Sequence, residues 1–144
     1  RELVNLTTLH CRTNMLQQLN IPKELVNLTE VYCYDNQLQQ LNLPAELVNL
    51  TILDCSLNKL QQLNIPGELV NFTELACIQN QLQQLNIPGE LVNLAILICS
   101  ENPLLNLIMP NISPKLKEVY CKNTSAENRT LIDKLVALGI KVYY

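Results

Sequence analysis

The fourteen residues NQLQQLNIPGELVN, from position 80 to position 93, decide the fold of this protein. The same stretch occurs once before, at positions 58–71, with a lysine in place of one glutamine. A catalytic site is assembled once in a chain, whereas a segment that returns at a fixed interval indicates a structural unit stacked on its own copies. The sequence is therefore first of all a repeat array.

A 22-residue period extends over most of the 144-residue chain. Copies begin at Asn5, Asn27, Asn49, Asn71 and Asn93, and a degraded sixth copy begins at Lys115. Each full copy follows the pattern N-L-x-x-L-x-C-x-x-N-x-L-x-x-L-x-x-P-x-x-x-x, with small variations. Every copy has one cysteine at the same place: Cys11, Cys33, Cys55, Cys77, Cys99 and Cys121.

The alternating segment before each cysteine, such as Leu53-Asp54-Cys55, predicts a short, half-buried strand. Such a strand cannot bury a face alone, but copies stacked about 4.8 Å apart form a parallel sheet over a continuous apolar interior. The leucines at 16, 19 and 25 and their copies supply the rest of that core. A proline in each return segment, the first being Pro22, excludes a long helix there. We therefore expect an irregular or short 3₁₀ outer side.

In a stack of this kind, two further sets of repeated residues, the asparagines and the cysteines, have structural roles. Asn14 and its copies at 36, 58, 80 and 102 follow the strands, where a buried side-chain amide can satisfy open backbone groups. The cysteines point the same way on adjacent copies, which favours packing over disulfides, and their spacing lacks the close pairs of zinc sites. We therefore predict six free, inward-facing thiols, which favour a reducing compartment.

The pattern L-x-x-L-x-C-x-x-N-x-L-x-x-L resembles the leucine-rich repeat consensus, with cysteine in place of the third leucine, over roughly residues 3–124. The resemblance implies an α/β fold: a curved solenoid with parallel strands on its concave side, where partner proteins usually bind, and an irregular or 3₁₀ convex side. Short repeats with proline in the return segment are most similar to bacterial leucine-rich repeat proteins, including effectors that pathogens deliver into host cells.

We divide the chain into leucine-rich repeats over residues 1–124, a partial first repeat and six copies, and a helix–strand cap over residues 125–144. Arg1-Glu2-Leu3-Val4 matches the tail of a repeat, so the first copy lacks a polar cap. We therefore expect upstream sequence in the natural protein. For the chain as given, we expect a monomer that can associate end to end through this exposed edge.

The carboxyl-terminal cap has three sequence signals. Thr124 and Glu127 have the spacing of a capping box. A helical apolar stripe follows, and Gly139 suits the position just past the helix. Ile140 and Val142 follow Val119 and Cys121 at one position less than the full period and predict a seventh strand of the sheet. The residues of the stripe are Leu131, Ile132, Leu135 and Val136.

Composition argues against several classes of function. The formal net charge is −3, and no basic face for nucleic acid is visible. The longest apolar run, residues 94–99, is too short for a membrane span. His10 precedes Cys11, but neighbours along a strand face opposite sides, so they cannot form a nucleophile–base pair. We expect no enzyme, cofactor or metal site in this chain.

Two repeated surface features allow more than one interpretation. Asn5-Leu6-Thr7 and its copies from Asn27, Asn49 and Asn71 match the N-x-[ST] sequon. A turn role for the asparagine is favoured because the motif recurs with the repeat, and glycosylation is the alternative. Gln17-Gln18 recurs unchanged at 39–40, 61–62 and 83–84, either as a hydrogen-bonded ladder or as a relic of duplication.

The outward strand positions vary between copies, and several of them are large and apolar. Exposed aliphatic and tyrosine side chains flanked by carboxylates resemble a protein interface with a polar rim. Random drift on an unconstrained face is the alternative. The predicted binding residues are Tyr32, Tyr34, Ile52, Asp54, Glu74, Ile78, Ile96, Ile98 and Tyr120.

The sequence thus predicts a non-enzymatic recognition module that holds a protein partner on its concave face. The resemblance to bacterial effectors implies a host protein as partner, met inside the host cell after secretion by the bacterium. The alternatives are the substrate-recognition domain of a larger ubiquitin-ligase effector, a surface adhesin or internalin-like protein, and a scaffold without a dedicated concave site.

Overall fold

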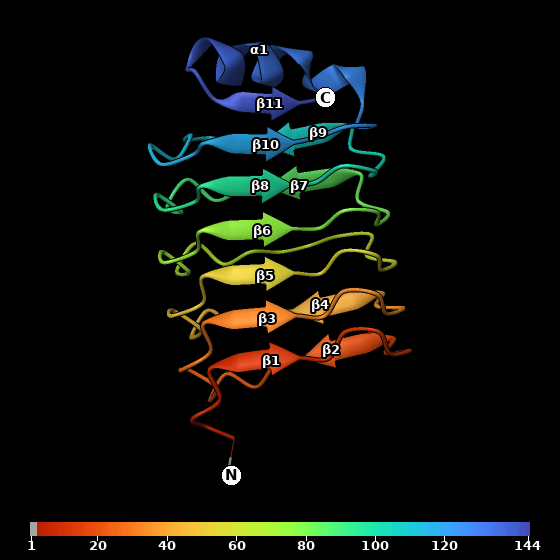
Figure 1. Cartoon of the computed structure of the whole chain (residues 1–144), viewed down its shortest axis with the longest axis vertical. Coiled ribbons are helices and arrows are strands. Elements are labelled where there is room, and N and C mark those ends of the chain that lie inside the picture. The colour runs from red at the N-terminus through yellow and green to blue at the C-terminus, as the bar shows by residue number, and fades with distance from the viewer. Residues whose placement is uncertain (1–2) are drawn as a thin grey trace.

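A computed structural model describes residues 3–144 as a stack of 22-residue coils, here called rungs (Figure 1). One three-residue strand from each rung enters a single seven-stranded parallel sheet. In spatial order the strands are β1 (Thr8–His10), β3 (Glu30–Tyr32), β5 (Ile52–Asp54), β6 (Glu74–Ala76), β8 (Ile96–Ile98), β10 (Glu118–Tyr120) and β11 (Lys141–Tyr143). The predicted solenoid is confirmed.

The register of the first six strands reproduces the repeat. Leu9 pairs with Val31, and each later central residue pairs with its copy in the next rung, as Leu53 does with Leu75. Because side chains alternate across a strand, this register places every central residue in the core. From Val31 to Val119 these central residues are fully buried. The interior is one continuous apolar column along the stack.

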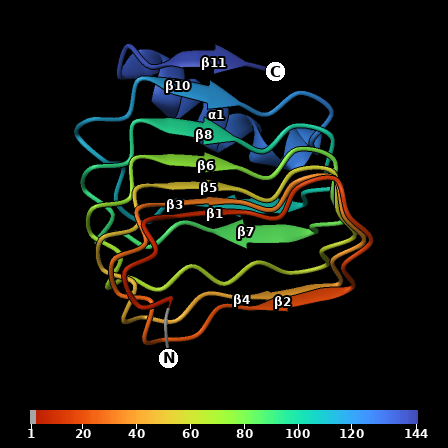
Figure 2. The same cartoon turned by 60° about the horizontal axis from the view of Figure 1, so that its bottom comes forward.

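The opposite side of each coil is largely irregular, as expected, with short extended segments and no 3₁₀ turn in the described repeats (Figure 2). Four rungs carry short strands there, which pair as β2 (Gln18–Asn20) with β4 (Gln40–Asn42) and β7 (Gln84–Asn86) with β9 (Asn106–Ile108). Two causes explain the difference from a 3₁₀ side. The alternation Gln-Leu-Asn buries only its leucine, and the residue before each proline is biased to extended backbone.

The cysteines and the turn asparagines occupy the predicted interior positions. All six cysteines are free, and all but Cys11, in the first rung, are buried. Asn36, Asn58, Asn80 and Asn102 are buried as well, whereas Asn14 is exposed. The residue before each of these asparagines has a left-handed backbone conformation, with φ between 54° and 58° from Asp35 to Glu101. Each rung therefore turns inward at the same place.

The cap contains a 3₁₀ turn, η1 (Ala126–Asn128), and one helix, α1 (Arg129–Ala137), at the end of the stack beside β11 (Figure 1). The predicted capping box between Thr124 and Glu127 is wrong. Thr124 occupies the ladder position, and its hydroxyl donates to the Cys121 carbonyl at 2.8 Å. Ser125 takes the capping role instead, because its Oγ accepts from the Glu127 N–H at 3.2 Å.

The predicted apolar stripe of the helix is only partly correct. Ile132 and Leu135 are buried, and Leu131 packs partly against the core, but Val136 is 50% exposed. The helix has nine residues and lies over one end of the stack, so only one side of it contacts the core. Val136 lies outside that side. No helix among the described residues combines the length and the apolarity that a membrane crossing needs.

The last strand joins the sheet as predicted, but in a different register. Val142 pairs with Val119 rather than with Cys121. The shift is two positions along the strand, so the same side chains still face the core. The turn after α1 accounts for the shift: Gly139 has a φ of 81°, and Ile140 is buried before the strand begins. Gly139 confirms the expected position just past the helix.

Candidate binding surface

The outward side chains of the seven-stranded sheet form one surface, here called the strand face. It consists of three columns: the first residue of each strand, the third residue, and the residue two positions after the third. On β3 these residues are Glu30, Tyr32 and Tyr34. All nine predicted binding residues lie on it, and each is half-buried. The structure thus brings them onto one side of five adjacent strands, β3 to β10.

Carboxylates and aliphatic groups alternate along the first column of the strand face. From β1 to β11 the aligned residues are Thr8, Glu30, Ile52, Glu74, Ile96, Glu118 and Lys141. The three glutamates therefore recur at every second strand, about 10 Å apart. Glu74 has an aliphatic neighbour on both sides, whereas Glu30 lies between Thr8 and Ile52, and Glu118 lies between Ile96 and Lys141.

Two aromatic stacks mark the ends of the second column. His10 and Tyr32 stack with ring centroids 4.8 Å apart, and Tyr120 and Tyr143 stack at 4.4 Å. The sequence prediction missed His10 and Tyr143. The sequence could have identified His10, because the 22-residue period aligns it with Tyr32. Tyr143 could not be found in this way, because its alignment with Tyr120 depends on the register of β11.

Each stack also orients a carboxylate. The Tyr32 hydroxyl donates to Glu30 Oε2 at 3.0 Å, and the Tyr120 hydroxyl donates to Glu118 Oε2 at 2.7 Å. Desolvation and the bond to Glu30 raise the pKa of Tyr32, while the bond to Glu118, above all, raises the pKa of Tyr120 to about 12. Both phenols therefore remain neutral donors at physiological pH.

Between the aromatic stacks, the second column has smaller side chains. Asp54, Ala76 and Ile98 follow one another, and Ala76 is only 6% exposed. The Asp54 carboxylate accepts the N–H of Ser56 at 3.0 Å. The Glu74 carboxylate beside Ala76 has no hydrogen bond or ion pair with another described side chain. The middle of the strand face is thus an aliphatic floor with one unpaired carboxylate.

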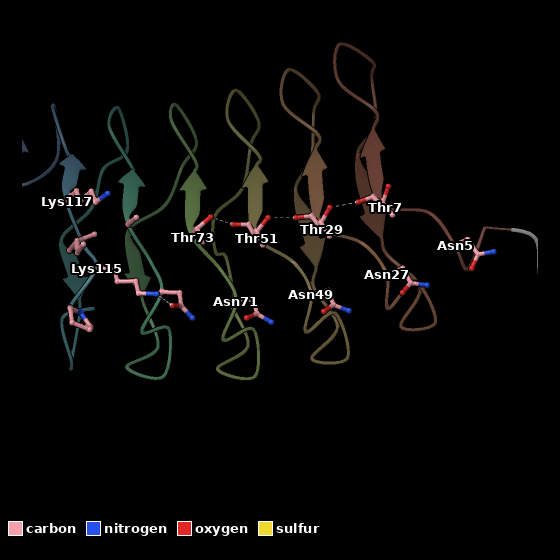
Figure 3. A pocket seen from close by; sticks show the side chains of 14 residues that line it. Asn5, Thr7, Asn27, Thr29, Asn49, Thr51, Asn71, Thr73, Lys115 and Lys117 are labelled. Atoms are coloured by element: carbon pink, nitrogen blue, oxygen red, sulfur yellow. Dashed lines mark hydrogen bonds between the residues drawn. The ribbon is translucent and has the colours of Figure 1, made fainter.

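The largest hollow lies elsewhere, along the edge that precedes the strands (Figure 3). It is an open groove of about 980 Å³ lined mainly by the repeated asparagines and threonines of the N-x-T motif. Thr51 Oγ1 donates to the Thr29 carbonyl at 2.9 Å, and Asn49 Nδ2 donates to the Val26 carbonyl at 2.9 Å. The same bonds recur on neighbouring rungs, so these groups join rung to rung, which supports the turn role of the asparagine.

The remaining polar candidates have structural surroundings. His10 stacks on Tyr32 on the strand face, whereas Cys11 packs against the core, so the two side chains lie on opposite sides of the strand. Burial raises the pKa of the Cys77 thiol to about 12, which keeps it protonated. Within residues 3–144, no group of three or more His, Cys, Asp or Glu side chains is arranged to hold a metal ion.

The first rung has an apolar hollow at the end of the stack. Residues that include Leu3, Val4, Leu6 and Leu9 line about 580 Å³, and Leu3 is 65% exposed. Arg1 and Glu2 of the predicted repeat tail lie outside the described residues. End-to-end association through this hollow stays a prediction.

No protein-family model and no curated protein matches the sequence. Solved structures do match. The leucine-rich repeat protein LIC12759 of Leptospira interrogans is 26% identical, with a TM-score of 0.73 over 99% of this chain and 38% of its own. The chain has the fold of a leucine-rich repeat solenoid.

Two Listeria monocytogenes proteins share the leucine-rich repeat fold at lower identity. The functional domain of InlJ, which includes a cysteine ladder, is 24% identical, with a TM-score of 0.54 over 83% of this chain and 35% of that one. The internalin InlF is 16% identical, with a TM-score of 0.62 over 98% of this chain and 48% of that one. This chain therefore spans between about a third and a half of the solved proteins that it matches.

Proposed function

We propose that this leucine-rich repeat solenoid is a protein-recognition module whose strand face binds the partner. The observation that carries the proposal is an internal comparison of surface positions. In the first four copies, five exposed positions outside the strand face are unchanged, namely those of Gln17, Gln18, Asn20, Glu24 and Val26.

Over the same four copies, the strand face differs at every rung. Its second column reads His10, Tyr32, Asp54 and Ala76, and its third reads Arg12, Tyr34, Ser56 and Ile78. If outward positions simply drifted after duplication, the exposed glutamines and valines would have diverged as well. Outside the strand face, the columns of Thr13, Met15 and Lys23 differ between copies as well. Divergence is therefore uneven over the exposed surface, and the change of the strand face beside five unchanged columns favours a specialised surface over an unconstrained one.

The class of protein to which the module belongs is a further part of the proposal. The similar solved structures are bacterial. Six free thiols, five of them buried, suit a reducing compartment. We infer a bacterial effector whose partner is a host protein inside the host cell.

An internalin-like surface protein is the second candidate. The observation that favours it is the cysteine ladder, a feature that the functional domain of InlJ includes and that this chain has at Cys33 to Cys121. Buried thiols also persist outside a reducing compartment when no partner thiol has the right geometry. The complete reading frame distinguishes the two, because a surface protein requires an export signal and an anchor.

The test of recognition compares two double variants of equal charge change. Tyr34→Lys with Ile78→Lys places positive charges on the strand face, whereas Val48→Lys with Val70→Lys places them on exposed valines elsewhere. Each protein is used to select binders from a displayed library of protein fragments. We expect binders of the unmodified chain to be retained by the valine variant and lost by the strand-face variant at an unchanged melting temperature. Binders that tolerate the strand-face charges would reject this surface.

A further inference from the structure

We propose that the partner segment seated on the strand face is a basic helix whose lysine or arginine side chains, spaced two helical turns apart, pair with Glu30, Glu74 and Glu118. This inference rests on the proposed function and names the chemistry of the partner. It follows from the charge, the spacing and the shape of the strand face.

The charge of the strand face is acidic in its middle. Between β3 and β8 its outward positions include Glu30, Asp54 and Glu74 and no basic residue. Basic side chains lie only toward the two ends, at Arg12, Lys122 and Lys141, and Lys141 aligns with Glu118 on the adjacent strand. Glu74 is half-buried between Ile52 and Ile96 and has no partner among the described side chains. A half-buried carboxylate without a counter-charge favours a cationic ligand group.

The length of the aliphatic floor suits one element that runs along the stack. The floor of Ile52, Ala76 and Ile98 lies between the stacks that contain Tyr32 and Tyr120. Those tyrosines are four strand spacings apart, roughly 19 Å. About 13 residues of helix cover that length, and the apolar face of an amphipathic helix can pack on the floor.

The spacing of the carboxylates distinguishes a helix from an extended peptide. Glutamates at every second strand are about 10 Å apart. Seven residues of helix, two turns, rise about 10.5 Å and return to nearly the same side. In an extended strand, residues i and i+3 are separated by a similar length, but their side chains point to opposite faces. The alternation of Glu and Ile thus matches helical residues seven apart, with apolar residues between them.

The test selects peptides on the full chain and asks which carboxylates they need. A displayed library of random peptides of about 16 residues is selected on the unmodified protein, and enriched peptides are synthesised. Their Kd is measured by fluorescence anisotropy on two triple variants of equal charge change. Glu30→Gln with Glu74→Gln and Glu118→Gln removes the strand-face carboxylates, whereas Glu24→Gln with Glu46→Gln and Glu68→Gln removes exposed ones elsewhere.

We expect enriched peptides with Lys or Arg at positions i and i+7, helical circular dichroism on binding, and at least about tenfold weaker binding to the strand-face variant. The control variant should change Kd by less than about twofold. Peptides that lose binding to the variant Tyr34→Lys with Ile78→Lys, but not to the triple variant Glu30→Gln, Glu74→Gln and Glu118→Gln, would overturn the basic helix and leave the recognition surface standing. Peptides indifferent to both variants, or no enrichment at all, would overturn both.

Discussion

The side chain of Asn58 joins two adjacent rungs through the carbonyl oxygen of Cys33 in the preceding rung. Asn58 Nδ2 donates to that oxygen at 3.1 Å and to the Cys55 carbonyl of its own rung at 3.1 Å. Its Oδ1 accepts the Leu38 N–H at 2.9 Å. Nδ2 also donates to the Ser56 carbonyl at 3.1 Å, so one buried amide bonds to four backbone groups where the chain turns. The pattern recurs at Asn36, Asn80 and Asn102.

We predict that Asn58→Ala lowers the free energy of unfolding by about 3 kcal/mol, because it leaves buried backbone donors and acceptors without partners. Urea unfolding followed by circular dichroism measures the change. Asn14→Ala is the matched control, since Asn14 is exposed and bonds only to carbonyls of its own turn. Its loss should stay below about 1 kcal/mol. Equal losses in the two variants would contradict a role in joining buried rungs.

The thiols should make the fold sensitive to alkaline pH. Burial raises the pKa of Cys77 from 9.0 to about 12, so the folded state keeps a proton that the unfolded state has released. Stability is then complete below pH 9 and falls between pH 9 and about 12. Removing one such thiol with Cys77→Ala should make the slope of unfolding free energy against pH shallower by about 1.4 kcal/mol per unit.

Urea unfolding at several alkaline pH values, with a reductant present, gives this slope. The alanine substitution also loses packing energy, but this loss is the same at every pH. It therefore shifts the free energy of unfolding without changing its slope against pH. Cys11→Ala is the control, because Cys11 is only partly buried and should change the slope less. Identical slopes for Cys77→Ala and the unmodified protein would contradict a buried, protonated thiol.

Alkylation should distinguish one cysteine from the other five. Cys11 lies partly exposed in the first rung, whereas the cysteines from Cys33 to Cys121 are buried. Only a thiolate that the reagent can reach is alkylated, so native protein should acquire one carbamidomethyl group with iodoacetamide well before any other. Mass spectrometry of the intact protein counts the groups, and peptide mapping should place the first on Cys11. Fast labelling of Cys55 in native protein would show that the ladder opens to solvent.

The repeat period alone was sufficient to predict the rungs, the inward cysteines and the asparagine ladder, because each depends on one interaction that is repeated many times. A register equal to the repeat period places Leu53 beside Leu75 wherever the strands begin. The positions of the predicted binding residues followed from the same register. The register could not predict the function of these residues, because a periodic pattern shows which side chains share a face but not which molecule contacts them.

The cap was predicted less well because it occurs once. Thr124 and Glu127 have capping-box spacing, but the ladder bond to Cys121 takes the hydroxyl of Thr124. The register of β11 depends on the turn around Gly139 and on the burial of Ile140. This turn has no second copy in the chain, so the repeat could not predict its length. The left-handed turn residues were also missed, since Leu57 and Gln79 are not typical of that conformation.

Leu57 offers a way to stabilise the fold at one of these turns. Its φ is 55°, a conformation that costs a leucine roughly 1 kcal/mol and that asparagine tolerates, and its side chain is 42% exposed. We predict that Leu57→Asn raises the free energy of unfolding by about 0.5–1 kcal/mol, measured by thermal and urea unfolding.

Two variants test whether the gain in stability comes from relief of backbone strain at the positive φ or from replacing an exposed leucine by a polar residue. Leu105→Asn changes a leucine that is 52% exposed and lacks a positive φ, so it should give no gain. Asn123→Leu makes the reverse change at a φ of 56° and should destabilise the protein by at least that amount, because it also removes the bond from Asn123 Nδ2 to Glu101 Oε1 at 2.8 Å. If Leu57→Asn and Leu105→Asn raised stability equally, the gain would come from surface polarity, and the left-handed turn would carry no strain that a sequence change can remove.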